Sequence, residues 1–499
     1  MKFYTNVQPY RNSIFLRGYI DGEPFEEKVS YKPYLFIPSK LGNTKYSTLS
    51  GDKVDRIDFD SVYDAREFYK KYSQVNNFVV YGLDKFAYTC LYDNFPGVIE
   101  YDPQQIRVLN IDIEVAADEG FPDPAVANKE VTAITMSRSG KEIIALGCQE
   151  FNPPPNVKYY RCTDEVHLLQ VFINLWNSKA YCPDVVTGWN VEFFDIPYLV
   201  NRIALLLGDA AVKKLSPWKI VEPKETMLNG KLSPTYNIFG ITTLDYIAMY
   251  KKFMYTKLPS YKLDYVCHVE LDERKMNYEE YDSLIDLYRK NFQLFMEYNI
   301  RDVELVDKLD AKLKLLELVY AMAYDGKVNY QDCLQSIRQW DVIIHNYLLD
   351  SNIVIPPLTH NDDSTSLVGG YVKVPQVGMH NWVCSFDLTS LYPHLIMEYN
   401  ISQETFAGRL QHHIGIDGVL AGRLNDIREE FVSKDCAIAA NLCMYTRKKQ
   451  GFLPALMERM FEDRAVYKKQ MIEEKNRLEH ADPNDTELCD RIKRAISRI

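Results

Sequence analysis

The sequence predicts a mixed α/β protein of several domains. Its 499 residues are 46% hydrophobic and 25% charged, which is ordinary for globular proteins, and this length suggests roughly three domains. Residues 108–115 alternate apolar and polar side chains with the period of two that is typical of a β-strand, and residues 131–136 form a second strand candidate. Residues 164–178 and 292–313 carry apolar side chains at helical spacing. The chain therefore mixes both kinds of element.

Composition argues against export and against a membrane protein. No segment has the apolar length of a membrane span, and the N-terminus lacks the basic and apolar regions of a signal peptide. The ten cysteines include no Cys-x-x-Cys pair, so we expect reduced thiols and a cytoplasmic location, the host cytoplasm for a phage-encoded protein. The net charge of −11 argues mildly against a surface that coats nucleic acid, but it leaves room for a basic cleft.

Residues 1–103 are predicted to form a mixed α/β, strand-rich module with many tyrosines and phenylalanines. Within it, Pro33 and Pro38 bracket a short strand of the kind found at sheet edges. Aromatic side chains interleaved with lysines can stack on single-stranded bases. Such aromatics more commonly form the core while the lysines face solvent, and both interpretations stay open here.

The strand at 108–115 places Asp112 and Glu114 on the same face. Residues two apart on a strand lie roughly 6.6 Å from each other, so two charged carboxylates would repel. A cation between them would remove this conflict. The alternative is a half-buried strand whose polar face is simply wet, because alternation alone shows only which face is polar.

Further acidic residues follow in distinct contexts. Thr163 is the expected N-cap of the helix at 164–178. A strand then ends at Gly188, a loop carries Asn190, and a helix begins at about Asp195, with a proline in its first turn. Asp195 could serve only as that helix's N-cap.

Two signals come later in the same region. The Asn229–Gly230 pair lies between extended runs and predicts a β-hairpin turn. In the helix at 292–313, Tyr298 and Asp302 are four residues apart and share one face. As an isolated pair they would be ordinary surface neighbours.

Taken together, the acidic motifs resemble those of the DEDDy exonucleases, in the same order and in the same strand, loop and helix contexts. Four carboxylates, Asp112, Glu114, Asp195 and Asp302, can hold two divalent ions, which would prepare a water and stabilise the departing oxygen. Hard oxygen ligands favour Mg²⁺ or Mn²⁺, two per active site. Tyr298 is placed to orient the attacking water.

Three later segments extend the resemblance. Residues 366–372 are similar to the glycine-rich connector of family B DNA polymerases, residues 385–393 to their palm motif, and residues 461–468 to the first fingers helix of the T-even phage type. The whole chain resembles the amino-terminal part of such a polymerase. The resemblance implies an N-terminal domain (1–103), an RNase H-like 3′–5′ exonuclease (104–315), a return segment of the N-terminal domain (316–357), a partial palm (358–450) and partial helical fingers (451–499).

The resemblance also implies roles for individual residues. Asp387 and the Leu388 carbonyl would bind the polymerase metals, and Asp387 would close a strand before a helix that begins at Ser390. As an alternative, Asp387 could be only a helix N-cap, and a pair of glycines is commonly just a loop. The other implied contacts are Tyr392 under the incoming sugar, Arg464 and Lys468 on the triphosphate, and Phe121, Asn190, Gly369 and Gly370 on DNA.

The chain departs from the family at its end. We expect a helix at 455–480, a turn at 481–485 and the start of a returning helix at 486–499. The second palm carboxylate and the thumb are absent, so the exonuclease set is complete and the polymerase set is half present. Either a second polypeptide supplies the rest or the chain is a fragment, and a break near a hairpin tip favours the split subunit.

The implied partners are primer-template DNA, single-stranded DNA, deoxynucleoside triphosphates, the completing polypeptide and, as a candidate, a sliding clamp; no membrane is expected. Two other classes of function remain. A nucleic-acid-binding subunit or regulator with a vestigial exonuclease would be expected to have lost at least one of the four acids or the tyrosine, and all five are present. A scaffold that only recruits replication factors has no sequence feature of its own here.

Overall fold

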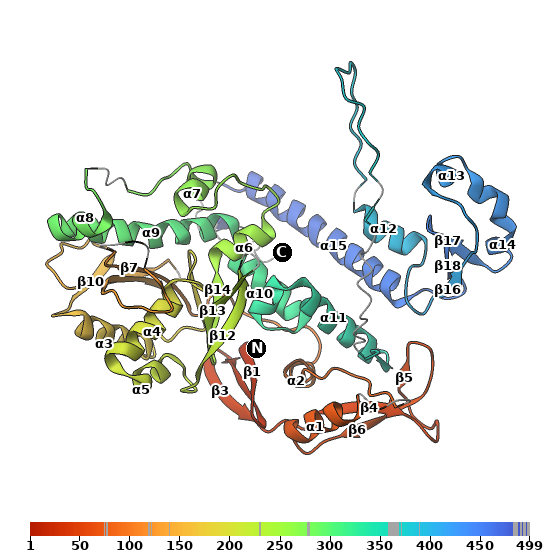
Figure 1. Cartoon of the computed structure of the whole chain (residues 1–499), viewed down its shortest axis with the longest axis horizontal. Helices are drawn as coiled ribbons and strands as arrows, with labels where there is room; N and C mark the ends of the chain where they lie inside the picture. The colour runs from red at the N-terminus through yellow and green to blue at the C-terminus, as the bar shows by residue number, and fades with distance from the viewer. Residues whose placement is uncertain are drawn as a thin grey trace. The chain divides into compact units, whose positions relative to one another are not determined.

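The computed structural model separates into two compact units, which comprise Met1–Ile37 with Arg56–Asn346, and Pro38–Asp55 with Tyr347–Ile499 (Figure 1). The structure describes residues 1–73, 75, 78–117, 120, 122–138, 140–228, 231–276, 280–357, 369–370, 372–388, 390–482, 488–489, 492 and 496.

The first unit begins with an antiparallel meander of β1 (Lys2–Tyr10), β2 (Ser13–Ile20) and β3 (Glu23–Val29). The predicted strand between Pro33 and Pro38 is confirmed as β4 (Tyr34–Pro38), which pairs with β6. The remaining elements of this region are β6 (Val54–Asp58), α1 (Val62–Tyr72) and α2 (Phe86–Asn94).

A six-stranded mixed sheet follows, with the order β10-β9-β8-β7-β11-β14. The predicted strand at 108–115 is its β7, which pairs antiparallel with β8 and parallel with β11. The β8–β9 pair is antiparallel, whereas the outer pairs β9–β10 and β11–β14 are parallel. The strands are β7 (Val108–Val115), β8 (Val131–Arg138), β9 (Glu142–Gly147), β10 (Val157–Arg161), β11 (Val185–Gly188) and β14 (Thr242–Asp245).

Helices cover both faces of this sheet (Figure 1). On one face α3 (Glu165–Trp176) and α4 (Asp195–Leu207) share a hydrophobic core with Leu109, Ile111 and Ile113 of β7. The long helix α9 (Phe292–Leu313) lies on the other face, with the bounds that the sequence predicts. The predicted N-cap of α3 is wrong. Asp164 takes that position because its extended backbone lets its carboxylate accept a hydrogen bond from the His167 amide at 2.8 Å.

Between α4 and α9 the chain forms an antiparallel hairpin and several short helices. The hairpin is confirmed over its two strands, while the Asn229–Gly230 turn lies outside the described residues. The elements are α5 (Asp209–Val212), the 3-10 turn η1 (Lys213–Leu215), β12 (Val221–Leu228), β13 (Lys231–Ile238), α6 (Tyr246–Phe253), α7 (Leu263–Leu271) and α8 (Leu284–Lys290).

A buried carboxylate joins the N-terminal meander to the six-stranded sheet. Asp184, which directly precedes β11, accepts a hydrogen bond from the Tyr19 hydroxyl at 2.6 Å and pairs with Arg17 at 3.3 Å. The backbone amide of Arg107, just before β7, also donates to Asp184, at 2.9 Å. Because these charges are buried together and hydrogen-bonded, they anchor the base of β7 and β11.

The chain then returns to the N-terminal strands through α10 (Leu315–Gly326), the 3-10 turn η2 (Tyr330–Leu334) and α11 (Ser336–Asp350). The Tyr4 hydroxyl of β1 donates to the Val328 carbonyl at 2.7 Å, and Asn329 hydrogen-bonds the backbone of Val7. These contacts agree with a return segment, while the division into five parts stays a prediction.

The second unit holds a small sheet of order β16-β18-β17 and the helix α15. Asn400 joins them, because its amide donates to the carbonyls of Thr446 and Lys449 and accepts from Gly451, the N-cap of α15. The elements are β5 (Ser47–Thr48), β15 (Ile353–Val354), α12 (Leu391–Glu398), β16 (Phe406–Arg409), α13 (Ile416–Leu420), η3 (Arg423–Ile427), α14 (Arg428–Val432), β17 (Cys436–Ile438), β18 (Cys443–Thr446) and α15 (Phe452–His480).

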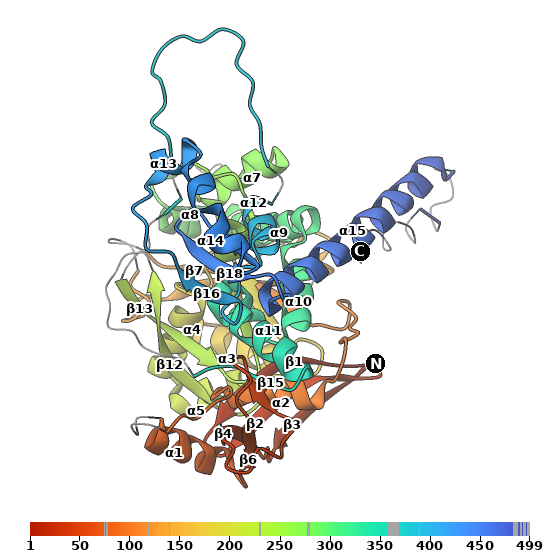
Figure 2. The same ribbon diagram turned by 90° about the vertical axis from the view of Figure 1, so that its right-hand side faces the viewer.

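The strand predicted to end at Asp387 is absent from the described residues. Figure 2 draws residues 372–388 as an open loop, and they are exposed. A strand needs a neighbour to pair its backbone groups, and no described strand pairs with this segment. The predicted helix at 455–480 is confirmed as α15, which begins earlier, at Phe452. Most of the turn and returning helix predicted at 481–499 lies outside the described residues.

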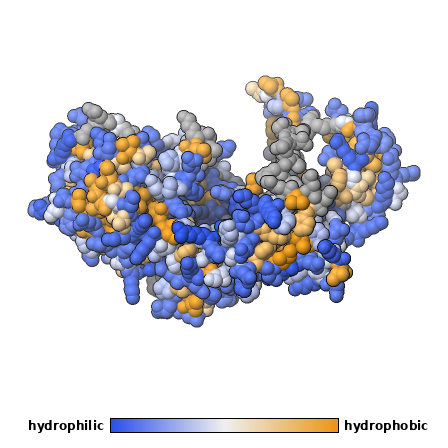
Figure 3. Space-filling view, turned by 60° about the horizontal axis from the view of Figure 1, so that its bottom comes forward, coloured by the Kyte–Doolittle hydropathy of each residue, from blue (hydrophilic) through white to orange (hydrophobic). Residues whose placement is uncertain are grey.

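All ten cysteines are free thiols. Of the helices in the described part of the chain, none is both long and apolar enough to cross a membrane. Hydrophilic residues cover most of the face drawn in Figure 3, and apolar residues show through as separate patches.

Candidate functional site

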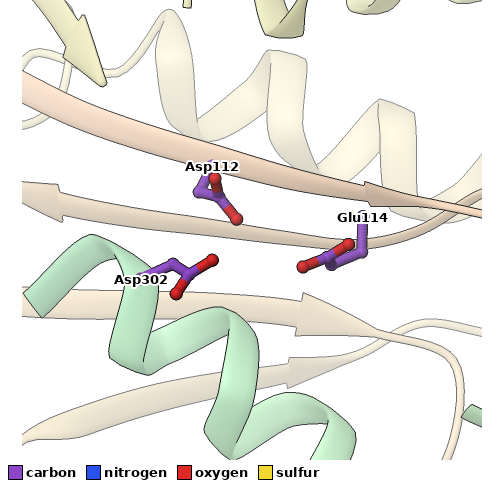
Figure 4. Close-up of side chains that lie close together, drawn as sticks. All are labelled: Asp112, Glu114 and Asp302. Atoms are coloured by element: carbon purple, nitrogen blue, oxygen red, sulfur yellow. The ribbon is translucent and has the colours of Figure 1, made fainter. Parts of the chain in front are cut away.

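Three carboxylates meet between β7 and α9. Asp112 and Glu114 project from the same face of β7, and Asp302 reaches them from α9 (Figure 4). One oxygen from each lies within 4.8 Å of the other two. Asp112 and Glu114 keep part of their surface open, whereas Asp302 is buried. The strand and helix periods of the sequence therefore converge on one acidic cluster.

Hydrogen bonds hold α9 in register over the strand. The Asn299 amide donates to Asp112 at 2.6 Å and accepts from the Thr135 hydroxyl of β8. On β7, the Asn110 amide donates to the Val303 carbonyl at 2.9 Å. These amides link strand and helix directly, so the position of Asp302 relative to Asp112 is set by both elements.

The fourth predicted acid, Asp195, is the first residue of α4 and is buried. Its Oδ1 accepts a hydrogen bond from the Ile113 amide at 3.0 Å, between Asp112 and Glu114 along β7. Asp195 is therefore more than a helix cap, because it fastens α4 to the acidic strand. Among the described residues, the group within 4.8 Å does not include it.

Burial and mutual repulsion make these groups unusually weak acids. Burial, followed by the charge of Asp302, raises the pKa of Glu114 to about 8. Burial also raises the pKa of Asp195 to about 7, against the opposing effect of its backbone hydrogen bonds. Burial also raises the pKa of Asp112 well above its usual value, and the charges of Asp302 and Glu114 raise it further.

A lysine that the sequence reasoning missed neutralises part of this charge. Lys275, in the segment after α7, forms an ion pair with Asp302 and donates to the Tyr298 hydroxyl at 3.2 Å. Burial alone would lower the pKa of Lys275, but Asp302, Tyr298 and Asp112 outweigh it, and the pKa lies above its usual value. Burial raises the pKa of Tyr298, and the negative charge of Asp302 raises it further. A lone lysine in a loop carries no pattern that would have revealed this contact.

The residues present fit a divalent cation. Within the described part of the chain, Oδ1 of Asp302 is buried and accepts no hydrogen bond, although a buried carboxylate oxygen normally has a partner. The donors around it are carboxylate oxygens, which suit Mg²⁺ or Mn²⁺ better than zinc.

Metal binding should therefore depend on pH. The folded pKa values of Glu114 and Asp195 are raised. Between about pH 4.5 and about pH 8 the folded chain therefore still holds protons that the unfolded chain has already released. Stability of the metal-free chain should fall as pH rises through this window. Mn²⁺ competes with those protons, so its stabilisation should be larger at about pH 8 than at about pH 6.

The measurement is the unfolding midpoint with and without Mn²⁺ at both pH values. The variant Asp112→Ala/Glu114→Ala should lose most of the metal-induced shift. An equal shift in that variant would show that the ion binds elsewhere.

Of the residues predicted to contact DNA, Asn190 lies in the loop that leads to Asp195. Asn190 has a left-handed backbone (φ 71°), and its backbone N–H donates to the buried carboxylate of Asp245 at 3.2 Å. Asp245 also accepts from the amides of Glu192 and Ile247, so it holds the loop before Asp195 against the start of α6. Phe121 lies outside the described residues.

Two family models match the chain. One is described as DNA polymerase family B, exonuclease domain, and covers residues 55–266; the other is DNA polymerase family B and covers residues 330–490. The chain belongs to the family B DNA polymerases. The first match includes Asp112 and Glu114 of β7 and Asp195 at the start of α4. The second match begins after the end of α9, the helix that carries Asp302.

Several polymerases are similar over most of this chain. The DNA-directed DNA polymerase of Escherichia phage RB69 is 34% identical to this chain, and the match covers 94% of this chain and 54% of the phage protein. The DNA-directed DNA polymerase of Enterobacteria phage T4 is 32% identical, and the match covers 96% of this chain and 55% of the phage protein. The DNA polymerase delta catalytic subunit of Schizosaccharomyces pombe is 26% identical, and the match covers 60% of this chain and 29% of the yeast protein. The chain thus spans about half the length of the two phage polymerases that it matches.

The polymerase residues predicted for this family member all lie in the second unit, and all are exposed. Asp387 and Leu388 are in the open loop, and Tyr392 is in the first turn of α12. Arg464 and Lys468 lie one turn apart on α15, and neither forms an ion pair with a described carboxylate. Gly369 and Gly370 are exposed as well, and a side chain at Gly370 would begin 3.8 Å from the Tyr392 hydroxyl. No carboxylate cluster around Asp387 is found among the described residues.

Proposed function

We propose that this chain is the amino-terminal part of a family B replicative DNA polymerase and carries its 3′–5′ proofreading exonuclease. The observation that supports this most is the convergence of Asp112, Glu114 and Asp302, with Asp195 fastened to the same strand and Tyr298 one helical turn from Asp302. The test is release of nucleoside monophosphates from the 3′ end of single-stranded DNA by the purified chain with Mg²⁺ or Mn²⁺.

In this proposal the four carboxylates hold two cations, which supply an activated water and stabilise the leaving sugar oxygen. Asn299 keeps Asp112 turned toward the cluster through its 2.6 Å hydrogen bond. Tyr298 directs its hydroxyl toward the site and orients the attacking water. Lys275 neutralises Asp302 and adds positive charge where the scissile phosphate must approach four acids.

The polymerase part of the proposal rests on the second unit. Asp387 and the Leu388 carbonyl would bind the metals for nucleotidyl transfer, Tyr392 would contact the sugar, and Arg464 and Lys468 would bind the triphosphate. Primer-template DNA and deoxynucleoside triphosphates are then the substrates. The second palm carboxylate must come from a second polypeptide or from a further part of a longer chain, and a sliding clamp remains a candidate partner.

The β12–β13 hairpin should help to separate a primer end from its template. Lys224 and Thr235 face each other in the ladder, so residues 225–234 can be replaced by Asn-Gly without changing the register. We expect this shortened variant to remove mismatched ends from duplex DNA at least about tenfold more slowly, because strand separation then has to occur without the hairpin.

Digestion of single-stranded DNA is the internal control for this variant, and its rate should change little. Equal losses on both substrates would mean that the hairpin supports the site itself and not strand separation.

A nucleic-acid-binding subunit with a vestigial exonuclease is the competing proposal. It would bind single-stranded DNA without cleaving it in any divalent metal. The presence of all four acids and Tyr298 around one cluster favours the active enzyme.

A further inference from the structure

A basic segment joins α6 to α7, and α7 packs on α9, the helix that carries Asp302. Residues 251–262, which we call the lysine loop, run from the last turn of α6 to the start of α7. They contain four lysines and no acidic residue, in a chain whose net charge is −11. Positive charge concentrated in this way marks a surface for phosphate groups.

The lysines of this loop differ from those on the neighbouring helix α9. Lys308 pairs with Glu273, and Lys312 pairs with Glu270. Within the described residues, by contrast, Lys251, Lys252, Lys257 and Lys262 form no ion pair with a carboxylate. All four are exposed, so their charge is available to a ligand.

Aromatic side chains accompany these lysines. Tyr255 is fully exposed, at 102% of its reference area, which is unusual for a large aromatic ring. Tyr261 lies beneath the ammonium of Lys251, 4.9 Å from the ring centre. Exposed rings next to lysines are the combination that binds single-stranded nucleic acid, because bases stack on the rings while ammonium groups contact the phosphates.

The loop is attached to the catalytic region at two points. The Trp189 indole donates to the Tyr261 carbonyl at 3.2 Å, and Trp189 directly precedes Asn190 in the loop that leads to Asp195. Directly after Lys262 the loop enters α7, and the segment after α7 carries Lys275 onto Asp302. The lysine loop is therefore connected to the loop before Asp195 and, through α7, to the segment that carries Lys275.

We propose that the lysine loop binds the phosphates of the single DNA strand that leads into the exonuclease site, and that Tyr255 stacks on one of its bases. This inference rests on the proposed exonuclease function. The surface supplies affinity and not chemistry, because the loop contributes no group to the carboxylate cluster.

The test measures binding of a fluorescent single-stranded oligonucleotide in EDTA, where no hydrolysis occurs, over a range of salt concentrations. In the variant Lys251→Ala/Lys257→Ala/Lys262→Ala, binding should weaken about tenfold at low salt. The slope of log affinity against log salt should become shallower by about 2, since each lost phosphate contact on a single strand removes roughly 0.7.

A matched control removes the same charge elsewhere. Lys213, Lys214 and Lys219 are exposed and lie in and after η1, which contacts α3 on the opposite face of the sheet from α9. Their triple alanine variant should keep the wild-type affinity and slope. An equal loss in this control would overturn the proposal, because the effect would then be one of total charge.

Tyr255 offers a test that does not change the charge. Tyr255→Ala should weaken oligonucleotide binding about fivefold or more, whereas Tyr255→Phe should retain it, because stacking needs the ring and not the hydroxyl. A full loss in the phenylalanine variant would contradict the stacking role.

The exonuclease assay separates this inference from the proposed function. If the wild type degrades DNA but the lysine-loop variant binds with unchanged affinity and slope, the loop does not contact DNA and only this inference fails; a loop that serves a protein partner would give this result. If the wild type is inert in every divalent metal, the proposed function fails whatever the binding shows.

Discussion

Replacing both Asp112 and Glu114 by alanine should lower the rate of single-stranded DNA degradation by at least about 10³-fold. Both carboxylates lie on β7 within 4.8 Å of Asp302, so their removal leaves the proposed cations without two of their ligands. Metal positioning supplies most of the rate enhancement in such reactions, and the remaining groups cannot replace it. The measurement is single-turnover release of nucleotides from a 3′-labelled strand.

Folding of this variant should survive the change. Burial, followed by the charge of Asp302, raises the pKa of both acids, so removing them relieves an unfavourable burden on the folded chain. The variant should therefore unfold at the wild-type temperature or above it near pH 8 without metal. Glu100→Ala/Asp209→Ala removes two exposed acids and is the matched control, with full activity expected. If the Asp112/Glu114 variant keeps the wild-type rate, the assignment of the site is wrong.

Primer extension should be undetectable with the 499-residue chain alone. The described residues contain no carboxylate cluster around Asp387, which lies exposed in a loop without strand partners. Transfer by two metals needs carboxylates on both sides of the ions, and one acid cannot position them. Loss of that positioning removes several kcal/mol of transition-state stabilisation.

Adding the complementary part of the polymerase should restore templated synthesis, and Asp387→Ala should abolish the restored activity. The assay is best made in the Asp112→Ala/Glu114→Ala background, so that primer degradation does not obscure extension. In the wild-type background Asp387→Ala should leave exonuclease activity unchanged, because Asp387 lies in the other unit of the chain. Extension by the purified chain alone, or undiminished synthesis by the Asp387→Ala pair, would overturn this prediction.

The sequence by itself determined the elements that carry the acids proposed for the exonuclease site. Alternation over 108–115 predicts β7, and apolar spacing predicts α9 from Phe292 to Leu313. These predictions succeed because strand and helix periods are local properties, set by which side chains each face of one segment must bury. The order of the motifs then identified the family, and the family models agree.

Tertiary structure alone decided which groups meet these acids. Asn299 reaches Asp112, Asp245 holds the loop before Asp195, and Lys275 pairs with Asp302 from a loop without any repeating pattern. The strand predicted to end at Asp387 also depended on tertiary structure. Among the described residues no strand pairs with this segment, and the local sequence pattern could not show that. Pairing of strands and of buried charges depends on segments far apart in the chain, and local periodicity carries no information about those partners.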